Sequence, residues 1–308
     1  MSRWMRGAVW LLLGCAAAGT AAWPAPAGKQ VLLIATVNAR GTVRGCGCGS
    51  ERTGGLAEKV GVVDRLREQQ ENVLLVDAGD AVAARGGQVP NERVIAGMAA
   101  GRYAALNVGD EEAAWGLGYL RPAAAEAGLN LLSSNLIERA TGRPAFTPEL
   151  SLNLQGVRVA LLGVIAPGWE QRQQPAVADE LTTLDPAAAL AERVPRLRGN
   201  HDLVVVLAQL RLAQGRTLLE QVPGIDVIVG GEERSSRERA GPLGGAFWLQ
   251  SRPYGKGMMM ARIRIGADGP SVLGWRRVLF PLGGPTNAGV ARILAGQQEP
   301  EPPPGRAH

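Results

Sequence analysis

The feature that most constrains the fold is an apolar run that ends in two acids, Asn72 to Asp80. A continuous apolar run of this length, closed by a turn that contains glycine, predicts a buried strand. Ligands of open α/β sheets bind where the carboxyl ends of such strands meet, so Asp77 and Asp80 are candidate site residues. The same two acids could instead only cap a turn or the next helix. The neighbouring strands decide between these interpretations by the groups that they supply.

Apolar runs and helical patterns alternate along the first 230 residues. Strands are expected at 31–36, 73–76, 156–165, 203–207 and 225–229, and helices at 56–70, 91–101, 117–127, 186–197 and 213–221. This alternation predicts an α/β protein with parallel strands. From Ala246 onward the pattern changes to short strands separated by turns, which predicts an antiparallel C-terminal portion. No linker interrupts 30–296, so we expect one domain, followed by a disordered Pro/Glu tail at 297–308.

The composition limits the possible partners. The 308 residues are 46% hydrophobic, enough for a sizeable core. The formal net charge is only +5, and no basic run is interleaved with aromatic residues, which argues against a nucleic-acid partner.

The N-terminus has the pattern of an export signal. Arg3 and Arg6 precede the apolar run 8–13, which is too short to span a bilayer. Leu-Leu-Gly-Cys at 12–15 resembles a bacterial lipobox, in which Cys15 would be acylated. We therefore predict a signal peptide at 1–15, a tether at 16–29, and a protein held at the membrane of the bacterial cell envelope by a lipid on Cys15. An ordinary signal peptide, cut after one of the alanines at 16–22, is the alternative.

Cys46-Gly47-Cys48 is the remaining cysteine pair once Cys15 is set aside. An exported protein meets an oxidising compartment, so the pair could form a strained disulfide or offer two thiolates to a soft metal. A static disulfide that pins the loop is the alternative. His201 and His308 are the only histidines, which argues against a complete zinc site in this chain.

Six short motifs occur in an order that resembles the calcineurin-like metallophosphoesterase superfamily, in particular the catalytic domain of the 5′-nucleotidase and UDP-sugar hydrolase family. The motifs lie at 54–57, 74–80, 102–105, 134–135, 156–159 and 224–228. The resemblance implies a four-layer α-β-β-α sandwich with mixed sheets. It also implies a site for two divalent metals at the strand ends, which activate a water and hold the phosphoryl oxygens.

The ligand motifs of that family carry over only in part. Asp80 keeps the place of the bridging acid, but the first motif falls on Asn38-Ala39-Arg40 and brings a cation instead of a histidine. Asp110 replaces an amide ligand, and Glu111 replaces the phosphate-facing histidine, which makes Glu111 the candidate catalytic residue. The later histidines fall on Gln209 and on Glu232-Glu233. Gly199-Asn200-His201-Asp202 spells the family's third motif, but it precedes a strand and is interpreted as a loop.

Two sites are possible with these residues. Oxygen ligands from Asn38, Asp80, Asp110 and Glu233 could hold Ca²⁺ or Mg²⁺. Alternatively Arg40, which lines the site together with Glu232 and Gln209, replaces the lost cation. It then neutralises Asp80 and the surrounding glutamates, and no cofactor is needed. The second interpretation predicts a catalytically degenerate binding or assembly protein, with envelope proteins or a phosphorylated small molecule as partners. The alternatives are a phosphoric-ester hydrolase with a remodelled carboxylate metal site, and a thiol-redox or soft-metal handling protein.

Overall fold

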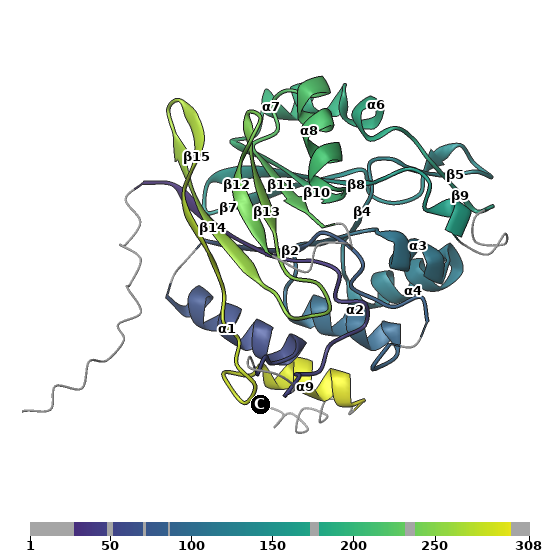
Figure 1. Cartoon of the computed structure of the whole chain (residues 1–308), viewed down its shortest axis with the longest axis vertical. Helices are drawn as coiled ribbons and strands as arrows, with labels where there is room; N and C mark the ends of the chain where they lie inside the picture. Colours follow the sequence, from purple (N-terminus) through teal and green to yellow (C-terminus); the bar gives the residue numbers. More distant parts are fainter. Residues whose placement is uncertain are drawn as a thin grey trace, which may run out of the picture.

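The computed structural model describes residues 28–47, 52–69, 72–85, 87–172, 179–231 and 238–296. Two six-stranded sheets pack face to face, and a layer of helices covers the outer face of each (Figure 1). This is the expected four-layer α-β-β-α sandwich. The predicted signal peptide with Cys15, the tether up to residue 27, Cys48, Glu232, Glu233 and the tail at 297–308 lie outside the described residues.

The first sheet has the strand order β15-β14-β1-β2-β3-β4. Its parallel strands are β1 (Gln30–Thr36), β2 (Val73–Asp77), β3 (Ala105–Asn107) and β4 (Leu131–Leu132). The hairpin of β14 (Met259–Gly266) and β15 (Gly269–Arg277) extends it in the antiparallel sense. The helices α1 (Leu56–Glu68), α2 (Asn91–Ala100), α4 (Leu117–Ala127) and α9 (Ala288–Ala295) contribute buried side chains to the core on its outer face.

The second sheet has the order β12-β13-β11-β10-β8-β7. Its strands are β12 (Arg239–Leu243), β13 (Ala246–Gln250), β11 (Val227–Gly230), β10 (Leu203–Gln209), β8 (Val157–Ile165) and β7 (Glu149–Leu154). The helices α6 (Pro186–Leu190), α7 (Arg193–Arg198) and α8 (Leu212–Gln221) cover its outer face. A second apolar core fills the space between the two sheets. A small third sheet joins β5 (Leu136–Glu138), β6 (Arg143–Pro144) and β9 (Leu181–Thr183), and η1 (Glu170–Arg172) precedes β9.

Two sequence-based expectations need correction, and one strand was not expected. The helix expected at 186–197 is two helices, α6 and α7, because Pro195 has no N–H for the carbonyl of Ala191, four residues earlier. The strand at 246–250 pairs in the antiparallel sense with β12 but runs parallel to β11. β12 itself is not expected from the sequence, because Arg239–Leu243 contains glycine and proline and lacks an apolar run.

The connections place the carboxyl ends of the parallel strands at one edge of each sheet. β1, β2 and β3 run parallel in the first sheet, as do β8, β10 and β11 in the second. The loops that follow these strands carry the residues singled out in the sequence. Within the described part of the chain, no helix combines the length and apolar character that crossing a bilayer requires.

Candidate functional site

The loops that follow β1 and β2 run side by side and are joined by main-chain hydrogen bonds. The amide of Asn38 donates to the Gly79 carbonyl at 2.9 Å, and the amide of Arg40 donates to the Asp80 carbonyl at 2.8 Å. Asn38, Arg40 and Asp80 all adopt the left-handed conformation, with φ of 50°, 49° and 57°. A side chain in this conformation costs about 1 kcal/mol or more. Asparagine and aspartate adopt this conformation more readily than other residues, so the strain falls mainly on Arg40.

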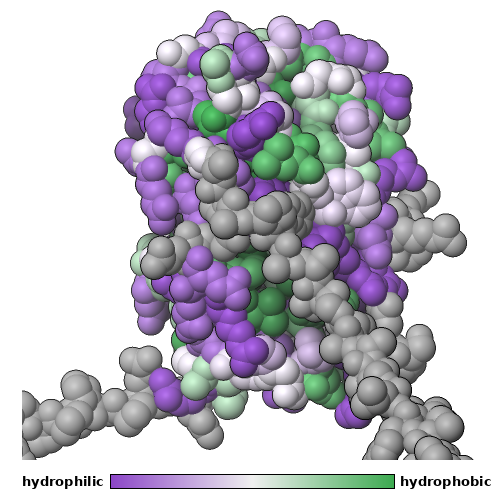
Figure 2. Space-filling model, turned by 90° about the vertical axis from the view of Figure 1, so that its left-hand side faces the viewer, coloured by the Kyte–Doolittle hydropathy of each residue, from purple (hydrophilic) through white to green (hydrophobic). Residues whose placement is uncertain are grey.

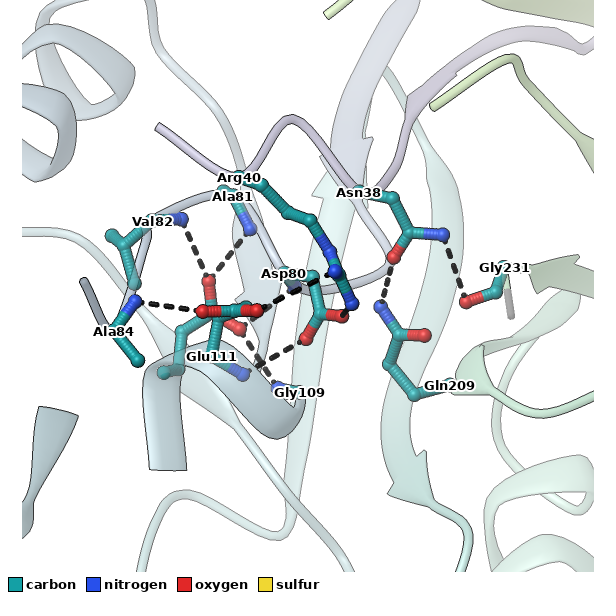
Figure 3. Close-up of polar contacts among 11 residues, drawn as sticks. Asn38, Arg40, Asp80, Ala81, Val82, Ala84, Gly109, Glu111, Gln209 and Gly231 are labelled. Carbon is teal, nitrogen blue, oxygen red and sulfur yellow. Dashed lines mark hydrogen bonds and ion pairs between the residues drawn. The ribbon is translucent and has the colours of Figure 1, made fainter. Parts of the chain in front are cut away.

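Arg40 lies between two carboxylates (Figure 3). Its Nη2 is 3.4 Å from Oδ2 of Asp80, and its Nη1 is 3.6 Å from Oε1 of Glu111. The other oxygen of Asp80 accepts a hydrogen bond from the Glu111 amide at 3.1 Å. Asp80 is 3% exposed, so a cation beside it offsets much of the cost of burying its charge.

Glu112 is a fully buried carboxylate at the last position of the third motif, Gly109 to Glu112, and the sequence alone assigns it no role. It belongs to the first turn of the helix α3 (Asp110–Trp115) and accepts the Gly109 amide at 2.9 Å, which is one half of a capping box because Gly109 has no side chain. The amides of the loop after β2 donate to the same carboxylate: Asp80 and Ala81 at 2.7 Å, and Val82 at 3.1 Å. Glu112 thus fixes the loop that carries Asp80. The Gly-x-x-Glu pattern directly after a strand is the sequence signal that could have found it.

Burial raises the pKa values of both acids at the centre. For Asp80 burial is the main cause and the negative charge of Asp110 the second, and together they raise its pKa to about 7. For Glu112, burial and then the charge of Asp80 raise the pKa to about 8. Folding therefore favours the protonated form of each group near neutral pH.

The opposite side of the site is formed by amides. Nε2 of Gln209, at the end of β10, donates to Oδ1 of Asn38 at 2.8 Å. Nδ2 of Asn38 in turn donates to the carbonyl of Gly231 at 3.3 Å (Figure 3). Asn38 and Gln209 thereby link the first sheet to the loop after β11, and both are buried.

Of the other residues singled out in the sequence, Asp110 and Glu111 lie at the site and His201 does not. Asp110 begins α3 and acts electrostatically on Asp80, and Glu111 accepts the Ala84 amide at 2.7 Å. His201 lies at the opposite end of β10, where Nδ1 is 3.0 Å from the Leu197 carbonyl. It is a loop residue, as its position before a strand predicts.

Asp77 caps a turn, which is the alternative interpretation of the acidic strand end. Its Oδ1 accepts the Gly79 amide at 2.8 Å, and its Oδ2 accepts the hydroxyl of Thr36 at 2.5 Å. Lys59 is also buried and interacts electrostatically with Asp77, and its pKa is lowered to about 8 by burial. Burial raises the pKa of Asp77 to about 6. Of the two acids, only Asp80 therefore faces Arg40.

These residues do not fit a two-metal centre. Oδ2 of Asp80 meets the guanidinium of Arg40, and Oδ1 of Asn38 meets the amide of Gln209. Each of these oxygens is thus already paired with a cation or an N–H group, which weakens it as a metal ligand. Within the described ranges, no three residues among His, Cys, Asp and Glu are grouped so that they could hold a metal ion.

The predicted thiol pair is described only at Cys46. This residue is half-buried, and its main chain forms a bridge to Thr53, with N–O distances of 2.9 and 3.2 Å. Cys48 lies outside the described residues, so the redox or metal role of the pair stays a prediction.

Comparison with known proteins relates the chain to nucleotidases. No protein-family model matches it. It is 26% identical over 211 residues to a 2′,3′-cyclic-nucleotide 2′-phosphodiesterase/3′-nucleotidase of Yersinia enterocolitica, a match that covers 58% of this chain and 32% of that protein. It is also 26% identical over 241 residues to the human 5′-nucleotidase, with coverage of 71% and 40%. The chain thus spans less than half the length of these relatives.

Solved structures share the fold at lower identity. The 5′-nucleotidase precursor of Thermus thermophilus superposes with a TM-score of 0.69 at 22% identity, over 87% of this chain and 58% of that chain. The sulfate thiohydrolase SoxB of Thermus thermophilus gives 0.75 at 16% identity, over 89% and 61%. The calcineurin-like phosphoesterase YfkN of Bacillus subtilis gives 0.68 at 18% identity, over 87% and 96%.

The class of protein follows from these observations: the chain has the fold of the calcineurin-like metallophosphoesterases. Within this class, its sequence is similar to that of the 5′-nucleotidases, as the order of the motifs predicts.

Proposed function

We propose that the chain is a 5′-nucleotidase-like protein in which a guanidinium–carboxylate centre has replaced the metal centre, and that it acts as a binding or assembly protein. The observation that carries the proposal is the position of Arg40 between Asp80 and Glu111. A divalent ion beside Asp80 would lie within a few ångströms of this cation and be repelled by it. Fold alone does not decide the chemistry, since one of the similar structures is a sulfate thiohydrolase.

The proposal includes a place in the cell. An exported chain with a lipid on Cys15 would reside in the bacterial cell envelope, with envelope proteins or a phosphorylated small molecule as partners. The pattern at 1–15 supports export. Incorporation of labelled fatty acid into the wild-type protein and its loss in Cys15→Ser test the anchor. An unlabelled wild-type protein would favour the ordinary signal peptide.

The catalytic question is tested by metal analysis of the purified mature protein together with a phosphatase screen. The substrates are p-nitrophenyl phosphate and AMP, each with added Mn²⁺, Mg²⁺ or Ca²⁺. We expect no bound divalent metal and no turnover above that of a buffer blank. Asp185→Asn, which changes the capping acid of α6, is a matched control for Asp80→Asn.

A phosphoric-ester hydrolase with a remodelled carboxylate site is the second candidate. The similarity to nucleotidases supports it, and so do the negative charges of Asp110 and Glu111, which act on Asp80. Bound divalent metal and turnover that Asp80→Asn abolishes, while Asp185→Asn leaves it unchanged, would establish this function in place of the first.

A further inference from the structure

A second site lies apart from the Asp80 centre, on the surface next to the Cys46 loop. A pocket of about 330 Å³ is lined by Arg52, Thr53, Lys256 and the segment from Arg277 to Pro281. Its three cations come from distant parts of the chain: the segment paired with Cys46, the loop between β13 and β14, and the end of β15. Arg52, Lys256 and Arg277 thus converge on one cavity only in the folded protein.

Positive charge predominates around this pocket. No acidic side chain is among its described lining residues. Arg277 pairs with Glu238 at long range, with Nη1 and Oε1 3.9 Å apart. Glu238 also lies 3.7 Å from Nε of Arg252. Since three cationic side chains and no acidic one are among the described lining residues, we expect a positive potential in the pocket.

The other wall of the pocket is apolar. Val278 and Phe280 are buried, whereas Leu279, between them, is 67% exposed. Trp275 and Arg277, two residues apart, lie on one face of β15, and Trp275 is 47% exposed. Figure 2 looks at the side of the molecule on which β14 and β15 lie, and shows hydrophobic areas that interrupt a largely hydrophilic surface. Nζ of the buried Lys59 lies 5.1 Å from the centre of the Phe280 ring, and this cation–π contact helps to fix the ring in the wall of the pocket.

We propose that this pocket binds an organic phosphate monoester whose apolar group packs on Leu279 and Phe280. Arginine forms paired hydrogen bonds with phosphate oxygens, and a dianion suits three cations better than a carboxylate does. The cavity has room for a phosphate head and several carbon atoms. The ligand could be a soluble ester or the head group of a phosphatidic acid in a membrane, and both present the same chemistry. None of the described lining residues belongs to the Asp80 centre, so this proposal does not rest on the function proposed for that centre.

Calorimetric titration of the mature protein with hexyl phosphate tests the proposal, and vesicles of phosphatidylcholine with and without phosphatidic acid test the membrane source. We expect saturable binding of hexyl phosphate that weakens with salt, and that falls about tenfold or more in Arg52→Gln/Lys256→Gln. Arg216→Gln, which removes an exposed cation on α8, is the matched control and should bind as the wild type does. Leu279→Ser should weaken the binding of hexyl phosphate but not that of inorganic phosphate.

The outcomes separate this pocket from the Asp80 centre. Binding of vesicles alone, lost in the double variant, would support the pocket with a lipid as its source. Binding that is unchanged in the double variant but lost in Arg40→Gln would place the ligand at the Asp80 centre and overturn the proposal, while leaving the proposed function intact. Absence of binding to both hexyl phosphate and vesicles would also overturn it.

Discussion

At the scale of single residues, Glu112 is the main-chain acceptor that fixes the loops of the site. One carboxylate accepts hydrogen bonds from four main-chain amides, three of which belong to the loop after β2, at Asp80, Ala81 and Val82. Without this acceptor the amides would lie buried and unsatisfied, and each such group costs about 1–3 kcal/mol. Glu112 is therefore needed for the fold of the site whatever ligand the site binds.

Replacement of this acceptor should destabilise the protein strongly. We expect Glu112→Ala to lower the free energy of unfolding by at least about 3 kcal/mol, as measured by urea denaturation. Glu58→Ala is the matched control, since Glu58 occupies the same position in α1 and, among the residues that the structure describes, accepts one main-chain amide, that of Gly55. It should cost about 1 kcal/mol. Equal losses in the two variants would contradict the role assigned to Glu112.

Arg40 should matter for stability in a way that depends on pH. In Arg40→Met the buried Asp80 loses its cationic neighbour, so the pKa of Asp80 rises further and its ionised form becomes more costly. We expect a loss of about 1–2 kcal/mol at pH 8 and a smaller loss at pH 5, where Asp80 is protonated.

The double variant Arg40→Met/Asp80→Asn isolates this pair. Urea denaturation at pH 8 should show that Asp80→Asn recovers part of the stability lost in Arg40→Met, because no charge is then left unpaired. If the two losses simply add, Arg40 and Asp80 are not coupled and the guanidinium does not neutralise the acid.

At the scale of elements, the helix α8 and the strand β11 make room for one large ring. A Cβ added at Gly230 would lie 1.9 Å from the Trp248 ring, and one at Gly215 would lie 2.4 Å from it. Trp248 is 1% exposed and belongs to the core on the outer face of the second sheet. The close approach of α8 to this sheet therefore depends on glycine at both positions.

Glycines differ in the space that surrounds them, so two glycine-to-alanine changes should have opposite effects on stability. Gly230→Ala should destabilise the protein by at least about 2 kcal/mol, because the indole cannot move within a packed core. Gly118→Ala lies on an exposed part of α4, with no atom within 4 Å of the added Cβ. It should stabilise the protein by about 0.5–1 kcal/mol through helix propensity. Thermal unfolding measures both, and a loss of stability in Gly118→Ala would contradict the account of α4.

Most elements could be predicted from the sequence because their apolar periodicity is strong. The run before Asp80 and the helix at 117–127 are examples of this. The strand β12 could not be found, since it is stabilised by pairing with β13 and not by its own apolar residues. Its partner β13 carries an apolar run but joins β11 in the parallel sense, a choice that depends on tertiary packing and leaves no local pattern.

Site residues could be predicted from the sequence only where a motif of the resembling family assigns a role to that position. Arg40 and Asp80 follow different strands, and the resemblance to a known fold placed both at one edge, where they are in contact. The fourfold acceptor role of Glu112 depends on the path of the loop at 80–82, which no sequence pattern specifies. The role of Asp77 as a turn cap and not as a site residue also required the structure.

The buried titratable groups act together at the scale of the whole molecule. The pKa values of Asp77, Asp80 and Glu112 are raised to about 6, 7 and 8, so the folded chain holds protons that the unfolded chain releases above about pH 4–5. The stability that these groups contribute is complete below their unfolded pKa values and is lost as the pH rises through the folded ones. Lys59 acts in the opposite sense, because burial lowers its pKa to about 8. Between pH 8 and about 10 only the unfolded chain keeps this proton, so stability rises again.

We therefore expect the free energy of unfolding to pass through a minimum near pH 8. One pKa unit corresponds to about 1.4 kcal/mol, so the loss between pH 5 and pH 8 should reach at least about 3 kcal/mol. Urea denaturation at intervals of one pH unit from about 5 to 9 measures the curve. In Lys59→Met the rise above pH 8 should disappear while the fall below it remains, which assigns each side of the minimum to its groups. A free energy of unfolding that increases steadily from pH 5 to pH 8 would mean that burial does not raise the pKa values of the acids around Asp80.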